Sequence, residues 1–140
     1  MFVRSCWRPH SDADIYSFIA ENPWALLVNN GQSGPFVTSL PLLLDPSRGG
    51  KGVLVGHIAR ANAHADAVQN PETPTLVVFQ GPHSYVTSSW YPKRDMPPTY
   101  YYTAVHCYGT LRLQDEKETH RWVEILTAHG SSGRQWLEGE

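Results

Sequence analysis

An imidazole, a guanidinium and an amide follow one another in the stretch GHIARAN, residues 56–62. The stretch comes directly after an apolar run and before a segment rich in alanine, which is typical of a junction between a strand and a helix. Such a junction directs free backbone N–H groups and the positive end of a helix dipole toward one point, which favours an anion there. Arg60 adds a forked cationic donor, and His57 and Asn62 add further donors. These residue types together predict a phosphate-binding corner.

The same three residues also have a purely structural interpretation, which their spacing leaves open. Asn62 could cap the short helix, Arg60 could be solvated, and His57 could be a hydrogen-bonded strand residue. The stretch carries no Gly-rich phosphate-binding fingerprint that would decide between the two interpretations.

A second group of chemically useful residues lies in SSWYPKRDMPPTYYY, residues 88–102. Here hydroxyl groups, one indole and several tyrosines surround a proline-rich loop at residues 92–98. Aromatic rings with polar tips can line the faces of a flat conjugated ligand while their OH and NH groups orient it. They suit a packed dimer interface equally well. The composition of this stretch leaves both interpretations open.

Metal-assisted and nucleophilic chemistry have less support. The histidines show no HExxH pattern and no paired cysteines, so we expect no zinc site. A haem iron needs only one axial residue, which keeps His64 and His83 as candidates for that role. The sequence has neither GxSxG nor a cysteine signature with a partnered histidine, and catalytic residues therefore stay unassigned.

The bulk composition fits one globular domain without membrane spans. The chain has 140 residues, of which 41% are hydrophobic and 17% charged, with a formal net charge of −2. Its eleven Lys and Arg residues are scattered, so direct DNA binding is not supported. No apolar run approaches the roughly 20 residues of a membrane span, and no secretory signal is recognisable. Cys6 and Cys107 lack CxxC spacing, and we expect a cytoplasmic protein.

The elements that must position these residues alternate between short strands and helices. A capping box at Ser11 and Asp14 predicts a helix that ends near Asn22, and Asp115 with Glu118 predicts the start of a closing helix. Strands are expected at residues 24–30, 35–44, 53–58 and 75–81, followed by two more around the proline-rich loop, with a short helix at 59–68. This pattern is typical of an α+β protein built around an antiparallel sheet or small barrel.

Four motifs, read in order, resemble those of the PaiB-like FMN-binding split-barrel family, whose members are described as negative transcriptional regulators. They are TSLPLLLD, GHIARAN, VVFQGPHSYVTSSWYP and PPTYYYTAVHCYG, and the resemblance runs to about Leu113. It implies a six-stranded antiparallel split β-barrel with flanking helices and a homodimer with FMN at the subunit interface. We accordingly expect a single domain over residues 1–130, with a polar tail at 131–140 in place of the family's longer C-terminal segment.

The resemblance also assigns cofactor-binding residues by position. The HxARxN match implies that His57, Arg60 and Asn62 lie at the phosphate and ribityl end of FMN. Other family positions expected near the cofactor fall on Thr38, Ser88, Trp90, Tyr91, Thr99 and Tyr102. The chain departs from the family pattern in having TSLP for THLP, RANAHA for RANPxW, and PTYYY for PTWNY.

Three functions follow from this resemblance. The leading one is an FMN-binding protein, either a binding module or a flavin-dependent oxidoreductase in which the isoalloxazine carries the redox chemistry. The alternative is a haem-binding enzyme of the same family, such as a piperazate-synthase-like enzyme that forms nitrogen–nitrogen bonds, with haem b held by His64. The third is a structural or DNA-linked protein that has lost its cofactor.

Overall fold

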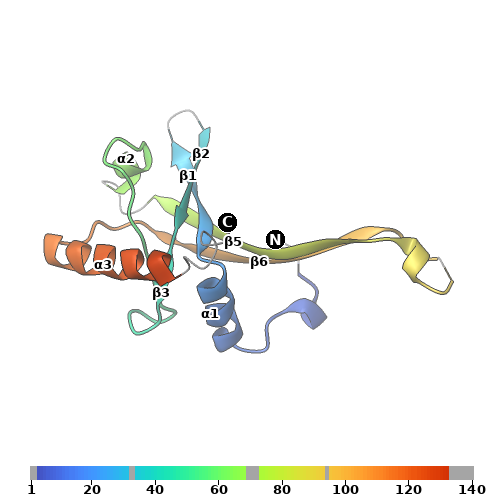
Figure 1. Ribbon diagram of the computed structural model, residues 1–140. Coiled ribbons are helices and arrows are strands. Elements are labelled where there is room, and N and C mark those ends of the chain that lie inside the picture. Colours follow the sequence, from blue (N-terminus) through green and yellow to red (C-terminus); the bar gives the residue numbers. More distant parts are fainter. Residues whose placement is uncertain (1–2, 32–33, 69–72, 94, 133–140) are drawn as a thin grey trace, which may run out of the picture.

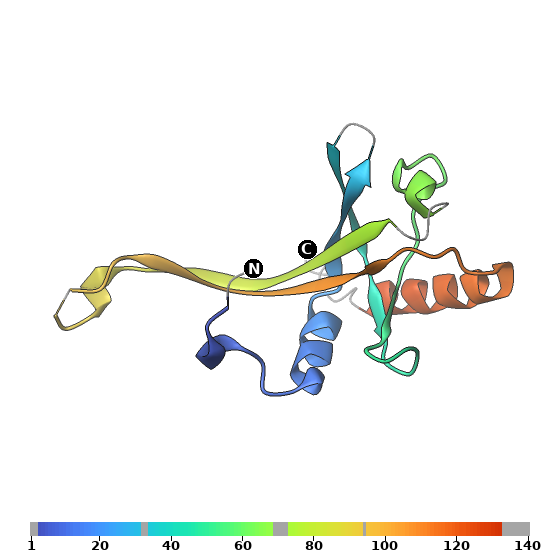
Figure 2. The ribbon, with the colours of Figure 1, turned by 180° about the vertical axis from the view of Figure 1, so that it is seen from behind.

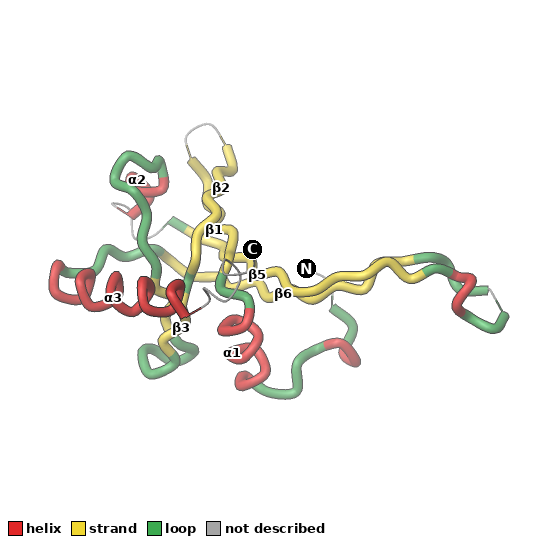
Figure 3. Tube along the Cα trace, in the orientation of Figure 1, coloured by secondary structure: helices red, strands yellow, loops and turns green. Residues whose placement is uncertain are grey.

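The strands of the protein form two antiparallel sheets (Figures 1 and 3). The computed structural model describes residues 3–31, 34–68, 73–93 and 95–132. A four-stranded sheet has the order β2-β1-β5-β6, and its strands span Trp24–Gly31 (β1), Gly34–Pro41 (β2), Pro74–Val86 (β5) and Thr99–Thr110 (β6). A two-stranded sheet pairs β3 (Leu43–Asp45) with β4 (Val53–Val55). The α+β class, the antiparallel pairing and the six strands expected of a split barrel are thus confirmed.

Three α-helices and two 3₁₀ turns accompany the sheets. They are α1 (Asp12–Glu21), α2 (His64–Val68), α3 (Glu116–Ser132), η1 (Ser5–Trp7) and η2 (Ser88–Trp90). The Ser11 hydroxyl accepts from the Asp14 N–H at 3.3 Å, and the Asp14 carboxylate accepts from the Ser11 N–H at 2.9 Å, which confirms the capping box. Asp115 likewise accepts from the Glu118 N–H at 2.8 Å at the start of α3. Within the described ranges, each helix is too short or too polar to cross a membrane.

One face of the four-stranded sheet packs against α1 and forms the core. The buried cluster joins the strands of this face to the helix and consists of Ile19, Ala25, Leu27, Leu40, Leu42, Val77 and Phe79. Ile15 and Phe18 also pack against this cluster, so α1 presents one apolar stripe to the sheet.

The opposite face of the same sheet, which we call the outer face, carries large apolar side chains that remain exposed. Its side chains follow from the strand register and form three rows: Val37, Val28, Leu76 and Tyr108; Ser39, Leu26, Val78 and His106; and Pro41, Trp24, Gln80 and Ala104. Val37, Trp24 and Tyr108 expose 51%, 64% and 73% of their surface. Such a face is typical of a surface that another protein covers.

Three strand predictions need correction. The apolar run at 35–44 is divided at Leu42, because the Leu42 N–H donates to the Pro23 carbonyl at 2.8 Å instead of continuing the ladder of β2. The strand expected at 53–58 ends at Val55, and residues 56–59 form an irregular loop. The strand expected to end at Gly81 continues to Val86, because the irregularity between Gln80 and His83 is a bulge and not a break.

Beyond this bulge β5 and β6 leave the rest of the molecule as a long two-stranded ribbon (Figures 1 and 2). We call residues 83–102 the arm. Its strands pair from His83 with Tyr102 to Val86 with Thr99, and η2 and the proline-rich loop form its tip. The arm exposes aromatic rings along its length, with Trp90 at 68% and Tyr100 at 62%. A two-stranded ribbon is at best marginally stable by itself in water, so we expect the arm to pack against another surface.

Candidate functional site

A groove of about 430 Å³ lies between the edge strand β2 and the loop that follows β4. It is lined by Thr38, Ser39, Leu40, Pro41, His57, Ile58, Ala59 and Asn62. The loop can approach β2 closely because residue 56 is glycine: a Cβ there would lie 2.9 Å from the Pro41 carbonyl oxygen. The structure thereby brings together Thr38, His57 and Asn62, three of the residues that the sequence assigned to the cofactor.

A buried hydrogen-bond network holds this groove against α2. The Asn62 amide donates to the Thr38 hydroxyl at 3.1 Å, and the Asn62 side-chain oxygen accepts from the His64 N–H at 2.9 Å. The Thr38 hydroxyl lies 2.8 Å from Nδ1 of His64. Much of the hydrogen-bonding capacity of Thr38 and Asn62 is therefore spent on positioning α2, and the capping interpretation of Asn62 is confirmed.

The sequence predicted that free N–H groups at the start of a helix would help to bind an anion, and this prediction is wrong. The expected helix at 59–68 is shortened to His64–Val68, and its first N–H groups are already used. Asn62 accepts from the backbone N–H groups of His64 and Ala65, and the Asp66 N–H donates to the Ala63 carbonyl. The charge that attracts an anion to this groove must come from side chains.

Arg60 and His57 are the side chains available for that purpose. Both are exposed on the loop, and neither forms a hydrogen bond or an ion pair with the described residues. His57 is therefore not the hydrogen-bonded strand residue of the structural interpretation. No carboxylate is among the residues that line the groove. A groove lined by hydroxyl, amide and imidazole groups beside an unpaired guanidinium fits a phosphate group.

The remaining predicted residues lie on the arm, which projects away from the groove of the same chain (Figures 1 and 2). Ser88 and Trp90 belong to η2 at the tip, and Tyr91 follows directly. Thr99 and Tyr102 lie on β6, opposite Val86 and His83. A hydrogen bond to Tyr101 raises the pKa of Tyr91. Within one chain the structure does not bring the two groups of residues together.

His64, the candidate axial ligand of a haem, lies in the interior. Its side chain is fully buried, its ring centroid lies 4.5 Å from that of Phe36, and its Nε2 atom has no hydrogen-bond partner among the described residues. The Nε2 atom is enclosed, so this arrangement does not present it to a haem iron. In this arrangement the histidine acts as a packed core residue that anchors Thr38.

Burial lowers the pKa of His64 below its ordinary value of 6.5, which predicts a pH-dependent stability. As the pH falls below 6.5, the unfolded chain takes up this proton before the folded chain does. The stabilisation is therefore complete above pH 6.5 and is lost as the pH falls toward the lowered pKa. In urea unfolding between about pH 5 and 7.5, His64→Phe should remove up to about 1.4 kcal/mol per pH unit from the slope.

The exposed histidine His120 on α3 supplies the control for this prediction. His120→Phe makes the same substitution at this exposed position and gives the reference curve for the effect at His64. If the unfolding free energies of the wild type and His64→Phe change with pH in parallel, His64 is not held neutral by the fold.

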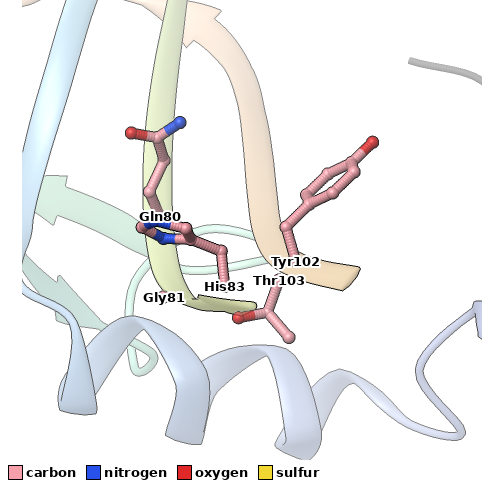
Figure 4. Close-up of a pocket in the computed structure, with 5 residues that line it drawn as sticks. All are labelled: Gln80, Gly81, His83, Tyr102 and Thr103. Atoms are coloured by element: carbon pink, nitrogen blue, oxygen red, sulfur yellow. The ribbon is translucent and has the colours of Figure 1, made fainter. Parts of the chain in front are cut away.

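Sequence reasoning missed a second hollow, at the bulge of β5. It measures about 270 Å³ and is lined by Gln80, Gly81, His83, Tyr102 and Thr103 (Figure 4). Only Tyr102 was among the predicted cofactor residues, and His83 was considered solely as a haem ligand. The GPH stretch, residues 81–83, was a usable signal, because glycine and proline inside an apolar strand pattern indicate a bulge.

Comparisons with known proteins identify the family of the chain. A family model described as “Putative FMN-binding domain” matches residues 1–138. Over 126 residues the chain is 32% identical to Protease synthase and sporulation protein PAI 2 of Bacillus subtilis, which covers 90% of the chain and 59% of that protein.

Two fungal proteins without an assigned function are also similar. An uncharacterised protein of Saccharomyces cerevisiae is 32% identical over 90 residues, covering 61% of the chain and 53% of that protein. One of Emericella nidulans is 28% identical over 156 residues, covering 90% of the chain and 62% of that protein. The chain thus spans between 53% and 62% of the length of these three relatives. Since the family model covers nearly all of the sequence and PAI 2 exceeds 30% identity over most of it, the chain belongs to the family of FMN-binding domains.

Proposed function

We propose that the protein binds FMN between two copies of the chain. The observation that carries this proposal is the separation of the family-site residues into two groups, one at the groove and one on an arm that projects away from it (Figure 2). A second copy would allow the arm of one chain to reach the groove region of the other, which would unite the two groups. FMN, when bound, supplies one-electron and two-electron chemistry at its isoalloxazine ring.

The groove holds the phosphate end of the cofactor in this proposal. Arg60 provides the charge and the forked donors, and His57 provides a further donor at the groove wall. Thr38 and Asn62 contribute mainly by fixing the groove wall through their bonds to each other and to His64. The absence of carboxylates from the groove lining supports this assignment, since a phosphate dianion would be repelled by them.

The outer face and the arm supply the dimer interface. The described residues bury only eight hydrophobic side chains, while Trp24, Val37 and Tyr108 on the outer face stay exposed. Exposed aromatic side chains on the arm add to this uncovered surface, and aromatic residues are enriched at the centres of protein interfaces. Burying both surfaces against a second copy would complete a core that one chain leaves small.

The proposed FMN site would allow a redox activity and a regulatory role. A bound flavin would make the protein a binding module or a flavin-dependent oxidoreductase, and the exposed groove allows access by a reductant. The similarity to a protein named for protease synthesis and sporulation supports a regulatory role. The scattered Lys and Arg residues favour regulation through a bound molecule or partner over direct contact with DNA.

A titration with FMN tests the proposal directly. Purified protein should perturb the absorption of added FMN, saturate at about one FMN per chain, and show twice the chain mass by light scattering. A Soret band in the protein as isolated would favour haem instead. A colourless protein that leaves the FMN spectrum unchanged would contradict the proposed function.

A further inference from the structure

The bulge in β5 creates a polar hollow on the outer face (Figure 4). Gly81 and Pro82 lie between the paired residues Gln80 and His83, so the ladder shifts at this point. As a result Gln80, His83 and Tyr102 point away from α1, and the imidazole of His83 lies across the strand toward Gln80 (Figure 4). An amide and an imidazole each donate and accept hydrogen bonds, which suits a ligand edge that carries both carbonyl and N–H groups.

Close contacts on the side that faces α1 require glycine at this bulge. A Cβ at residue 81 would lie 2.6 Å from the Thr103 hydroxyl and 2.7 Å from Cε2 of Phe18, so only glycine allows the strand to pass so close to α1. The Thr103 hydroxyl also donates to the Pro82 carbonyl at 3.2 Å. Bulges are frequent beside functional sites because they redirect one side chain, and here the redirected side chain is His83.

A row of side chains links this hollow to the groove within one chain. Trp24 pairs with Pro41, which lines the groove, and the next pair along β1 and β5 is Ala25 with Phe79. By this register Trp24 lies between Pro41 and Gln80 on the outer face, and its indole is 64% exposed. The backbones of Pro41 and Gln80 are about 10 Å apart, because two strand spacings separate them.

We infer that Trp24, Gln80 and His83 form a subsite for the flavin ring, with the indole stacked on the ring and the hollow binding its carbonyl and N–H edge. This assignment rests on the proposed function and extends it to residues that lie outside the phosphate groove. The order groove, indole, hollow matches the order phosphate, ring face and ring edge along a flavin nucleotide. An aromatic face beside paired donors and acceptors is the arrangement that a planar heterocycle requires.

Riboflavin separates the two subsites, since it has the ring and lacks the phosphate. Gln80→Ala and His83→Ala should each lower the affinity for FMN and the affinity for riboflavin by the same factor, roughly three- to tenfold. Trp24→Leu should weaken both compounds and raise the fluorescence of the bound flavin several-fold, because a stacked indole quenches it. The exposed histidine on α3 provides the matched control His120→Ala, which should change neither affinity nor fluorescence.

The outcomes distinguish this assignment from the proposed function. If the wild type binds FMN while the Trp24, Gln80 and His83 variants keep its affinities and fluorescence, the ring subsite is wrong and FMN binding stands. If the wild type binds neither flavin, both are overturned. All three side chains are exposed within one chain, so a wild-type circular dichroism spectrum will show that each variant folds, and light scattering will show whether it keeps the proposed dimer.

Discussion

Tyr108→Glu is expected to dissociate the proposed dimer into monomers and to abolish FMN binding with it. Tyr108 exposes 73% of its surface on the outer face, in the row that also contains Val37 and Leu76. A carboxylate buried there against a second copy would have no cationic partner on its own row. An unpaired buried charge costs several kcal/mol, which corresponds to about two to three orders of magnitude in the dimer dissociation constant.

Light scattering after size exclusion and an FMN titration measure the two effects on the same samples. Ala128→Glu introduces the same charge at an exposed position of α3 and should leave both the dimer and the FMN affinity intact. Because Tyr108 lies two rows away from Trp24, a carboxylate at this position should not touch the cofactor directly. A Tyr108→Glu protein that stays dimeric would exclude the outer face as the interface. A monomer that still binds FMN would instead contradict a cofactor site shared between copies.

Local sequence signals predicted the helices and hairpins of the fold well. The capping box of α1, the Asp115 cap of α3 and the pairing of β1 with β2 depend on residues close in the chain, so their pattern is visible in the sequence. The strand ends were predicted wrongly where a contact with a residue distant in the chain determines them. β2 ends because Leu42 bonds to Pro23, and β5 continues because Gly81 packs on Phe18. Neither contact can be read from residues that are adjacent in the chain.

For the candidate site, the sequence groups residues that are neighbours in the chain and does not show how separate groups are arranged. His57 and Asn62 belong to one short stretch, and the structure places both at one groove. The same reasoning could not separate the arm residues from the groove, because their distance depends on how far β5 and β6 extend. It also missed Trp24, whose position beside the groove follows only from the register of β1 with β2.

Arg60→Ala should weaken FMN binding by about 1–3 kcal/mol, or roughly five- to 150-fold, and should leave riboflavin binding unchanged. Arg60 is exposed beside the groove and has no ion pair among the described residues, so its removal leaves no buried group without a partner. The loss should therefore reflect the contact with phosphate and not a change in the fold. Isothermal titration with both flavins gives the two affinities.

The dependence on salt adds a second criterion for the same residue. The attraction between an exposed guanidinium and a phosphate is screened at high ionic strength, so FMN affinity of the wild type should fall between about 0.05 and 0.5 M salt more steeply than that of Arg60→Ala. Arg121→Ala, an exposed arginine on α3, should behave like the wild type. If Arg60→Ala loses affinity for FMN and riboflavin equally, Arg60 would be assigned to the flavin ring and not to the phosphate. Unchanged affinity for both would remove it from the site, and the groove would then have only the imidazole of His57 to attract an anion.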